Sequence, residues 1–215
     1  MDYGKLNTVE KAVVEILSIE VDFLPRKYIF SCLDSLGIYD DDKQMFTYTT
    51  IRPVLAELEA QGFILGTNKG VRVPAPFCFQ VVQELVKADR FAKIAHALLQ
   101  ASPFNIWNGH YRFDSDKAFF RALQIAMYGK KASVDIDVVY QCGMEAFPLD
   151  FRQNPPVLQL LNRPFQPQLL DNMALAVILL HAAKGPTLVL APLSVGANCP
   201  VSYDHHGHPG GKSSG

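Results

Sequence analysis

The chain of 215 residues has little of several features that define protein classes. Its four cysteines, Cys32, Cys78, Cys142 and Cys199, all lie more than three residues apart, which excludes a CxxC metal or redox motif. The formal charge is only −1, so no overall field attracts the chain to nucleic acid or to an anionic membrane. The longest apolar run, 173–183, is too short to span a bilayer.

Catalytic and cofactor motifs are missing as well. Serines such as Ser194 lack a Gly-x-Ser-x-Gly setting, and His96, His110 and His181 are single and scattered. The histidines at 205–208 lie in a polar tail that offers a metal no fixed geometry. We therefore predict no catalytic residue, no metal site and no cofactor, which means that the chain is not by itself a complete enzyme.

Two further properties bound the class of protein. Apolar residues make up 49 % of the chain, which is ample for a hydrophobic core and argues against general disorder. Residues 1–7 are polar and lack the basic-then-apolar profile of a signal peptide. Together with the isolated cysteines, this predicts a cytoplasmic protein with no membrane partner.

The first 75 residues follow a definite helical plan. A capping residue or a proline precedes each of three apolar repeats with helical spacing, and glycine ends the second and third. The expected starts are Thr8, Pro25 and either Thr49 or Thr50, and the expected glycine ends are Gly37 and Gly62. Ile51, Val54, Leu55 and Leu58 form the buried stripe of the third helix.

A β-hairpin is expected directly after the third helix. The apolar segments 63–65 and 71–73 flank the Gly/Asn-rich turn 66–70. Three helices followed by a hairpin predict a winged helix-turn-helix. Residues 55–64, Leu-Ala-Glu-Leu-Glu-Ala-Gln-Gly-Phe-Ile, resemble the recognition helix and wing entry of many bacterial winged-helix regulators. The alternative is a small α+β domain with no role in DNA binding.

Helical patterns continue after a plausible hinge at 74–76. They cover 79–99, with a soft break at 88–89, then 115–128 and 134–147, separated by polar loops such as 105–109. This rhythm resembles a helical-repeat scaffold, although no period recurs with matching residues.

The sequence thus predicts a mainly α protein with a short β-containing C-terminal part. The expected parts are a winged helix-turn-helix at 1–75, a helical domain at 79–165, a helix–strand stub at 166–200 and a disordered tail at 201–215. The expected strand of the stub is the apolar run 187–191, which is bounded by Gly and Pro.

A family resemblance is carried by the stub. Residues 185–198, Gly-Pro-Thr-Leu-Val-Leu-Ala-Pro-Leu-Ser-Val-Gly-Ala-Asn, resemble the second conserved segment of bacterial Swi/Snf-type DNA-dependent ATPases. Residues 174–180 resemble the helix that follows the phosphate loop of that family, and 171–173 resemble the lead into the loop. The loop itself, Gly-Leu-Gly-Lys-Thr, is absent between Met173 and Ala174, and no acidic metal-binding box is present. The resemblance therefore implies the N-terminal part of such a helicase with a shortened, inactive motor.

A winged helix binds DNA through its third helix and its wing. The residues expected to contact double-stranded DNA are Thr49, Thr50, Arg52, Gln61, Lys69 and Arg72. Residues 1–75 nevertheless carry eight Lys or Arg and eleven Asp or Glu, a net of −3, so binding by this part alone should be weak. The sequence therefore leaves two hypotheses, which are a non-catalytic DNA-binding regulatory protein and a protein–protein interaction adaptor that uses the helical domain.

Overall fold

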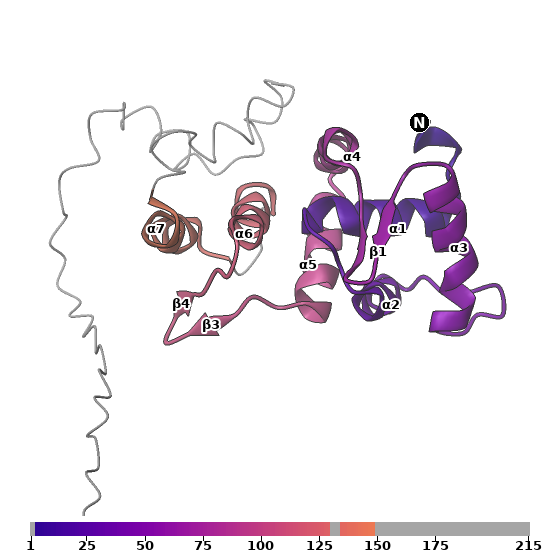
Figure 1. Ribbon diagram of the computed structural model, residues 1–215, viewed down its shortest axis with the longest axis horizontal. Coiled ribbons are helices and arrows are strands. Elements are labelled where there is room, and N and C mark those ends of the chain that lie inside the picture. Colours follow the sequence, from indigo (N-terminus) through magenta and orange to yellow (C-terminus); the bar gives the residue numbers. More distant parts are fainter. Residues whose placement is uncertain (1–2, 130–133, 149–215) are drawn as a thin grey trace, which may run out of the picture. The chain divides into compact units, whose positions relative to one another are not determined.

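The computed structural model describes residues 3–129 and 134–148, which are mainly helical with two small antiparallel strand pairs (Figure 1). The elements are η1 (Tyr3–Lys5), α1 (Thr8–Glu20), α2 (Arg26–Ser35), α3 (Tyr48–Ala60), β1 (Leu65–Thr67), β2 (Gly70–Arg72), α4 (Ala75–Lys87), α5 (Phe91–Ala101), β3 (Ile106–Trp107), β4 (His110–Tyr111), α6 (Asp116–Tyr128) and α7 (Ile136–Ala146). The stub expected at 166–200 and the tail expected at 201–215 lie outside the described residues. None of the described helices has the length and apolarity that crossing a membrane requires.

The N-terminus of α1 is capped by Asn7, and the prediction of Thr8 as the cap was wrong. Asn7 and Glu10 form a reciprocal capping box, in which each side chain accepts a 2.9 Å hydrogen bond from the backbone N–H of the other. The helix then buries the continuous run 12–19, because it passes through the centre of the core.

Helix α3 is also capped earlier than predicted, by two or three residues. Thr47 is the cap, instead of Thr49 or Thr50, and its hydroxyl accepts from the backbone N–H of Thr50 at 3.3 Å. The Thr50 hydroxyl in turn accepts from the Thr47 N–H at 2.9 Å. A Thr pair at this spacing satisfies the backbone as a capping box does, so the helix starts at Tyr48.

The first hairpin, β1–β2, is held against the segment that joins α1 to α2. Its register pairs Leu65 with Arg72 and Thr67 with Gly70. Leu24 and Val71 exchange two backbone hydrogen bonds of 2.9 and 3.1 Å, which add a one-residue bridge to the edge of the hairpin. The bridge leaves no room for a side chain at position 70, whose φ is +145°. The hairpin is therefore a fixed part of the core around α1.

Helices α4 and α5 continue this core. The predicted break is present between them, with Asp89 at a φ of +53°. Helix α4 packs on α1 and α5 packs on α2, and buried thiols bridge both contacts. The Cys78 thiol donates to the Ser18 carbonyl at 2.9 Å, and the Cys32 thiol donates to the Ala97 carbonyl at 3.7 Å. Residues on both sides of the proposed boundary near residue 75 thus share one hydrophobic cluster.

An ion pair between a buried carboxylate and a half-exposed arginine ties α1 to the residue that precedes α5. The Glu15 side chain has no exposed surface, and its two oxygens accept a bidentate pair of 2.8 Å hydrogen bonds from Arg90. The Tyr3 hydroxyl donates a further hydrogen bond to Glu15. Several partners therefore compensate the burial of this carboxylate.

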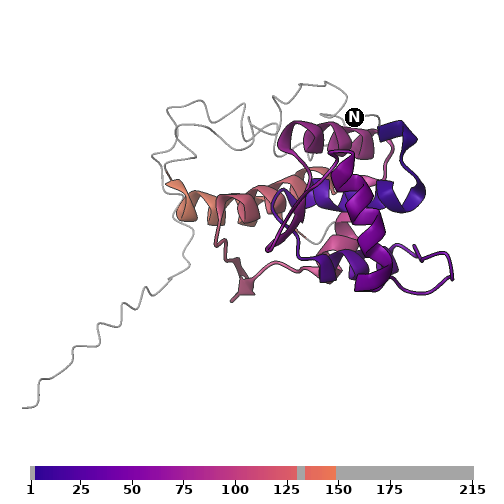
Figure 2. The ribbon, with the colours of Figure 1, turned by 45° about the vertical axis from the view of Figure 1, so that its right-hand side comes forward.

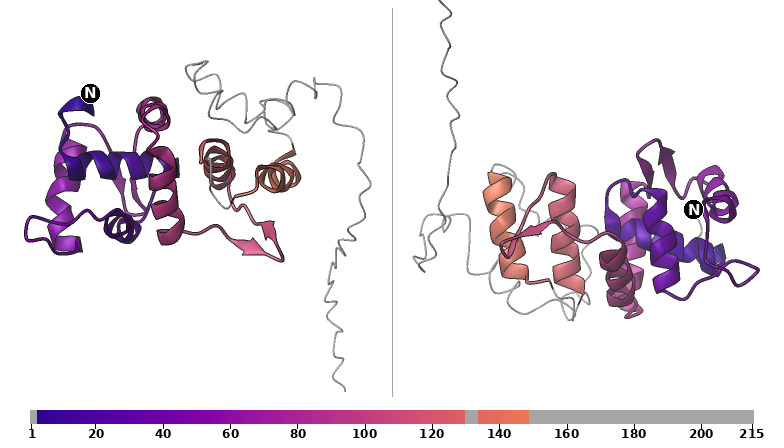
Figure 3. Two further views of the ribbon diagram at one scale, coloured as in Figure 1. Left: turned by 180° about the vertical axis from the view of Figure 1, so that it is seen from behind. Right: turned by 90° about the horizontal axis from the view of Figure 1, so that it is seen from below.

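The region 105–109, which we expected to be a polar loop, forms part of a second hairpin. Strands β3 and β4 pair Ile106 with Tyr111 and Trp107 with His110. The turn residues Asn108 and Gly109 have φ values of +50° and +79°, as a type I′ turn requires. Figure 3 shows this hairpin extending from the chain between α5 and α6.

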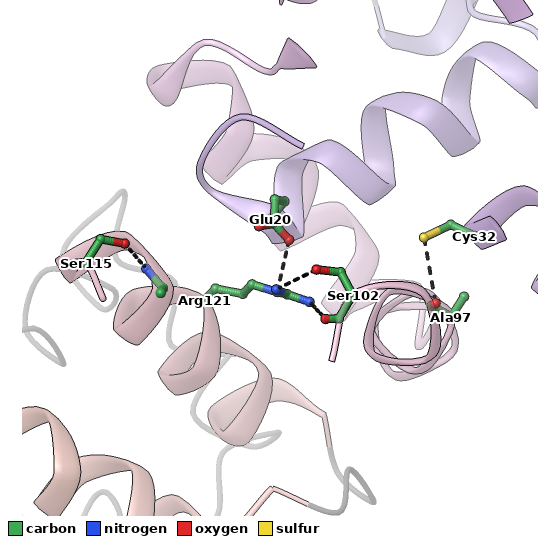
Figure 4. A network of polar contacts seen from close by, with 7 residues as sticks. Glu20, Cys32, Ala97, Ser102, Ser115 and Arg121 are labelled. Atoms are coloured by element: carbon green, nitrogen blue, oxygen red, sulfur yellow. Dashed lines mark hydrogen bonds and ion pairs between the residues drawn. The ribbon is translucent and has the colours of Figure 1, made fainter. Parts of the chain in front are cut away.

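Arg121 of α6 links the end of α1 to the segment that precedes β3 (Figure 4). Its guanidinium donates to the backbone carbonyl of Ser102, ahead of β3, and lies over the ring of Phe104 at 5.0 Å. Its Nε lies 3.0 Å from Oε2 of Glu20, near the end of α1, although the N–H is not aligned for a hydrogen bond. Burial raises the pKa of Glu20 to about 7, against the opposing charge of Arg121.

Candidate nucleic-acid interface

The side of α3 away from the core is open. Ile51, Leu55 and Leu58 bury one face of the helix, and the opposite face carries the exposed residues Thr49, Pro53, Ala56 and Ala60. In Figure 2, which turns this side forward, no described element crosses the front of α3. The face is narrow and uncharged along its centre, so any electrostatic contact must come from its flanks.

One flank of this face carries a cation. Arg52 is exposed, and its guanidinium has no hydrogen-bond or ion-pair partner among the described residues. The other charges on α3 are acidic, but both are engaged locally. Glu57 accepts a 2.6 Å hydrogen bond from Gln61, and Glu59 accepts one of 3.2 Å from the backbone N–H of Gly66. Glu59 thereby fixes the C-terminal half of α3 against β1.

The hairpin contributes a second cation. Lys69 lies in the turn, where its side chain is exposed and has no partner within the described part of the chain. Its backbone N–H donates to the Thr67 hydroxyl at 3.2 Å, which orders the turn. An ordered turn limits the movement of the Lys69 stem while its ammonium group stays in water.

Arg72 lies differently. It is half-buried, and its guanidinium stacks over the ring of Phe23 at 4.8 Å. Its Nε is buried without a hydrogen bond to any described residue. Partial burial raises the pKa of the adjacent Asp22, but the Phe23 N–H, Lys117 and the charge of Arg72 lower it further, so that it falls below the usual range. Arg72, at the end of β2, thus packs on the segment that joins α1 to α2.

The six residues predicted to contact DNA therefore fall into two groups. Thr49, Arg52 and Lys69 present free side chains to solvent around α3 and the hairpin turn. The other three, Thr50, Gln61 and Arg72, are engaged in the helix cap, a bond to Glu57 and a stack on Phe23. Spacing along a helix indicates which residues share a face, but it does not reveal local bonds that occupy their side chains.

Sequence reasoning also missed exposed apolar side chains. Met45 and Tyr48, at the start of α3, are 60 % and 58 % exposed. In the second hairpin, Ile106 and Trp107 are 54 % and 60 % exposed. The dipeptide Asn108-Gly109 was the signal that could have revealed the second hairpin, because it favours a two-residue turn.

The described thiols are not arranged for reaction. Cys32 and Cys78 are buried, and burial raises the pKa of each to about 12. Both donate to backbone carbonyls as small core residues do. Within 3–129 and 134–148, no three His, Cys, Asp or Glu side chains gather as metal ligands would.

Comparison with known proteins found no relative of the chain. No family model, no curated protein and no solved structure matches the chain.

Proposed function

We propose that residues 1–75 form a winged helix-turn-helix and that the chain is a non-catalytic regulatory protein that binds double-stranded DNA. The observation that supports this most is the uncovered outer face of α3, which is flanked by the free cation Arg52 and lies beside a hairpin that carries Lys69. A recognition helix must be accessible along its length to enter a major groove, and a wing must carry cations to contact phosphate.

The order of elements supports the same assignment. Three helices precede a hairpin, and Leu24, between the first two helices, bridges to Val71 on the hairpin. The bridge and the bond from Gly66 to Glu59 hold the hairpin against α1 and α3 at once. A wing fixed in this way would contact the DNA backbone without first having to become ordered. The entropic cost of binding would therefore be lower than for a flexible loop.

The charges limit the affinity. Of the three cations predicted to contact DNA, Arg52 and Lys69 are free to contact phosphates, whereas Arg72 stacks on Phe23. Two phosphate contacts give a slope of log K against log salt concentration of about −2. The chain should therefore bind duplex DNA weakly and mainly at low salt.

Fluorescence anisotropy with a labelled DNA duplex tests this proposal. At low salt we expect binding that weakens with salt at the slope given above, and Arg52→Ala or Lys69→Ala should each reduce the slope magnitude by about 0.9. Lys93→Ala is the matched control, because Lys93 is an exposed lysine on α5. Glu57→Gln should strengthen binding by removing a negative charge from α3. Absence of binding at low salt, or equal effects of Lys69→Ala and Lys93→Ala, would contradict the proposal.

A protein–protein adaptor is the second candidate, and the exposed side chains of Met45 and Tyr48 favour it. Large apolar groups that lie together in water are typical of protein contact surfaces. If duplex DNA does not bind, replacement of Met45 and Tyr48 by Ser should reduce the capture of a partner while Lys69→Ala leaves it unchanged.

The relation to Swi/Snf-type helicases remains a proposal of its own. It depends on residues 171–198, which lie outside the described part of the chain. The missing phosphate loop between Met173 and Ala174 supports a non-catalytic role for a protein of this type. Calorimetric titration with Mg-ATP should detect no binding at micromolar concentrations.

A further inference from the structure

The second hairpin presents two different faces. Because side chains alternate along a strand, Ile106 and Tyr111 share one face, and Trp107 and His110 share the other. A backbone hydrogen bond of 2.9 Å from Arg112 to the Asn105 carbonyl extends the ladder by one pair. Asn105 and Arg112 therefore lie on the same face as Trp107.

The first face anchors the hairpin. The Tyr111 ring is buried, and it packs edge-on against Phe104 at 5.7 Å and parallel to Phe113 at 5.9 Å. Phe113 in turn contacts Phe119 of α6. This aromatic cluster fixes the strand pair to the helices, so the opposite face is held out at a defined orientation.

All four side chains of the second face are exposed. They are Asn105, Trp107, His110 and Arg112, and the face contains no carboxylate. The guanidinium of Arg112 lies 5.1 Å from the centre of the Trp107 ring. An indole is usually well covered in a folded protein, yet 60 % of Trp107 is exposed even with this neighbour.

We propose that this face binds single-stranded nucleic acid by stacking an unpaired base on Trp107. An exposed indole offers a π surface to any base, and Arg112 supplies a cation that can stack and contact phosphate. Asn105 and His110 supply hydrogen-bonding groups beside the ring. A duplex would not fit this chemistry, because its bases are already stacked on one another.

The face that carries Ile106 makes it possible to distinguish binding of nucleic acid from binding of a protein. Ile106 is nearly as exposed as Trp107, but it points away from Arg112 and His110. An apolar partner that grips the hairpin would contact Ile106 as well as Trp107. A stacked base would contact only the face with Trp107.

Intrinsic fluorescence provides a specific reading of the site, because Trp107 is the only tryptophan of the chain. Titration of the full chain with an oligothymidylate of about 12 nucleotides at low salt should quench this emission. Anisotropy of the same labelled oligonucleotide should show that Trp107→Ala weakens binding about 5- to 100-fold, which corresponds to the loss of one stacked base. Trp107→Phe should retain most of the affinity.

The remaining variants define the outcomes. Arg112→Ala should reduce the magnitude of the slope of log K against log salt concentration by about 0.7. Ile106→Ala should leave binding unchanged. Arg52→Ala and Lys69→Ala should also leave it unchanged, so failure of the duplex proposal and failure of this one are separate results. Lack of quenching at low salt would overturn the inference. So would an Ile106→Ala loss as large as that of Trp107→Ala, since this points to a protein partner instead.

Discussion

The two hairpins of the chain share a secondary structure but differ in almost every contact. Each is a short antiparallel pair with a glycine in its turn region and an arginine over an aromatic ring. In β1–β2, the glycine Gly70 is buried against Leu24 and the arginine is half-buried. In β3–β4, Gly109 has no neighbour within 4 Å of where a Cβ would be, and the arginine is exposed.

The difference shows that a hairpin can hold a structure together or present a surface, depending on where its backbone meets other elements. The first hairpin is bonded along one edge to Leu24 and tied to α3 through Glu59. The second is anchored through one face only, by Tyr111. Substitutions at matched positions should therefore affect folding in the first and binding in the second.

The largest expected effect is that of an alanine at the two glycines. In Gly70→Ala the new Cβ would lie 2.2 Å from the Leu24 carbonyl oxygen, at a φ of +145°. Neither backbone can move without breaking the bridge, so we expect a loss of about 3 kcal/mol or more. In Gly109→Ala the space is open, and only the φ of +79° is unfavourable, which costs about 1 kcal/mol.

Urea titration of both variants measures this contrast in the free energy of unfolding. Gly37→Ala is a useful control, because Gly37 has a similar φ of +72° and also has open space around it. It should behave like Gly109→Ala. Equal losses at positions 70 and 109 would show that the contact with Leu24 does not constrain the first hairpin.

The same contrast explains what could be predicted from sequence. The first hairpin was predicted because a helix ending at Gly62 leads into apolar residues around a Gly/Asn-rich turn. Its strands are nevertheless shifted toward the turn, to 65–67 and 70–72, and Phe63 and Ile64 are buried ahead of β1. The second hairpin was missed because each of its strands has only two residues, too few to show alternation. Only its turn dipeptide carried information.

Helices were predicted more reliably than polar contacts. The break at 88–89, which the structure places at 88–90, and the helices near 116–128 and 136–146 were evident from apolar periodicity. The stack of Arg72 on Phe23 was not, because it depends on how the hairpin packs on the chain between α1 and α2. The same holds for the approach of Glu20 to Arg121, since 101 positions separate them in sequence and only the packing of α6 on α1 brings them together.

The second prediction uses the ionisation of Glu20, which lies at the end of α1 beside Arg121 of α6. Burial raises the pKa of Glu20 to about 7, from its ordinary value of 4.5. The folded state therefore binds a proton that the unfolded state has lost between these values. This contribution to stability is fully present below about pH 4.5 and is lost as the pH rises through 7.

Glu20→Gln removes that dependence. The stability of the natural chain relative to the variant should fall by about 1–3 kcal/mol between about pH 5 and about pH 8. Urea titrations of both proteins across this range measure the difference, in which other titrating groups cancel. Glu84→Gln serves as the control, because Glu84 is largely exposed and pairs with Lys87 at the surface. If the stability of the natural chain relative to Glu20→Gln instead rises with pH, Arg121 holds Glu20 ionised.

The smallest expected effect concerns the two stacked arginines. Arg72→Ala removes a half-buried guanidinium from Phe23 and a cation from beside Asp22, so we expect a loss of about 1 kcal/mol in the free energy of unfolding. Arg112→Ala removes an exposed stack on Trp107, and the loss should stay below about 0.5 kcal/mol. The order should reverse for oligothymidylate binding, which Arg112→Ala weakens and Arg72→Ala leaves unchanged. Urea titration and anisotropy on the same two variants measure both quantities. If Arg112→Ala destabilises the fold as much as Arg72→Ala does, the second hairpin is a structural element like the first. The exposure of Trp107 and Arg112 would then not indicate a binding site.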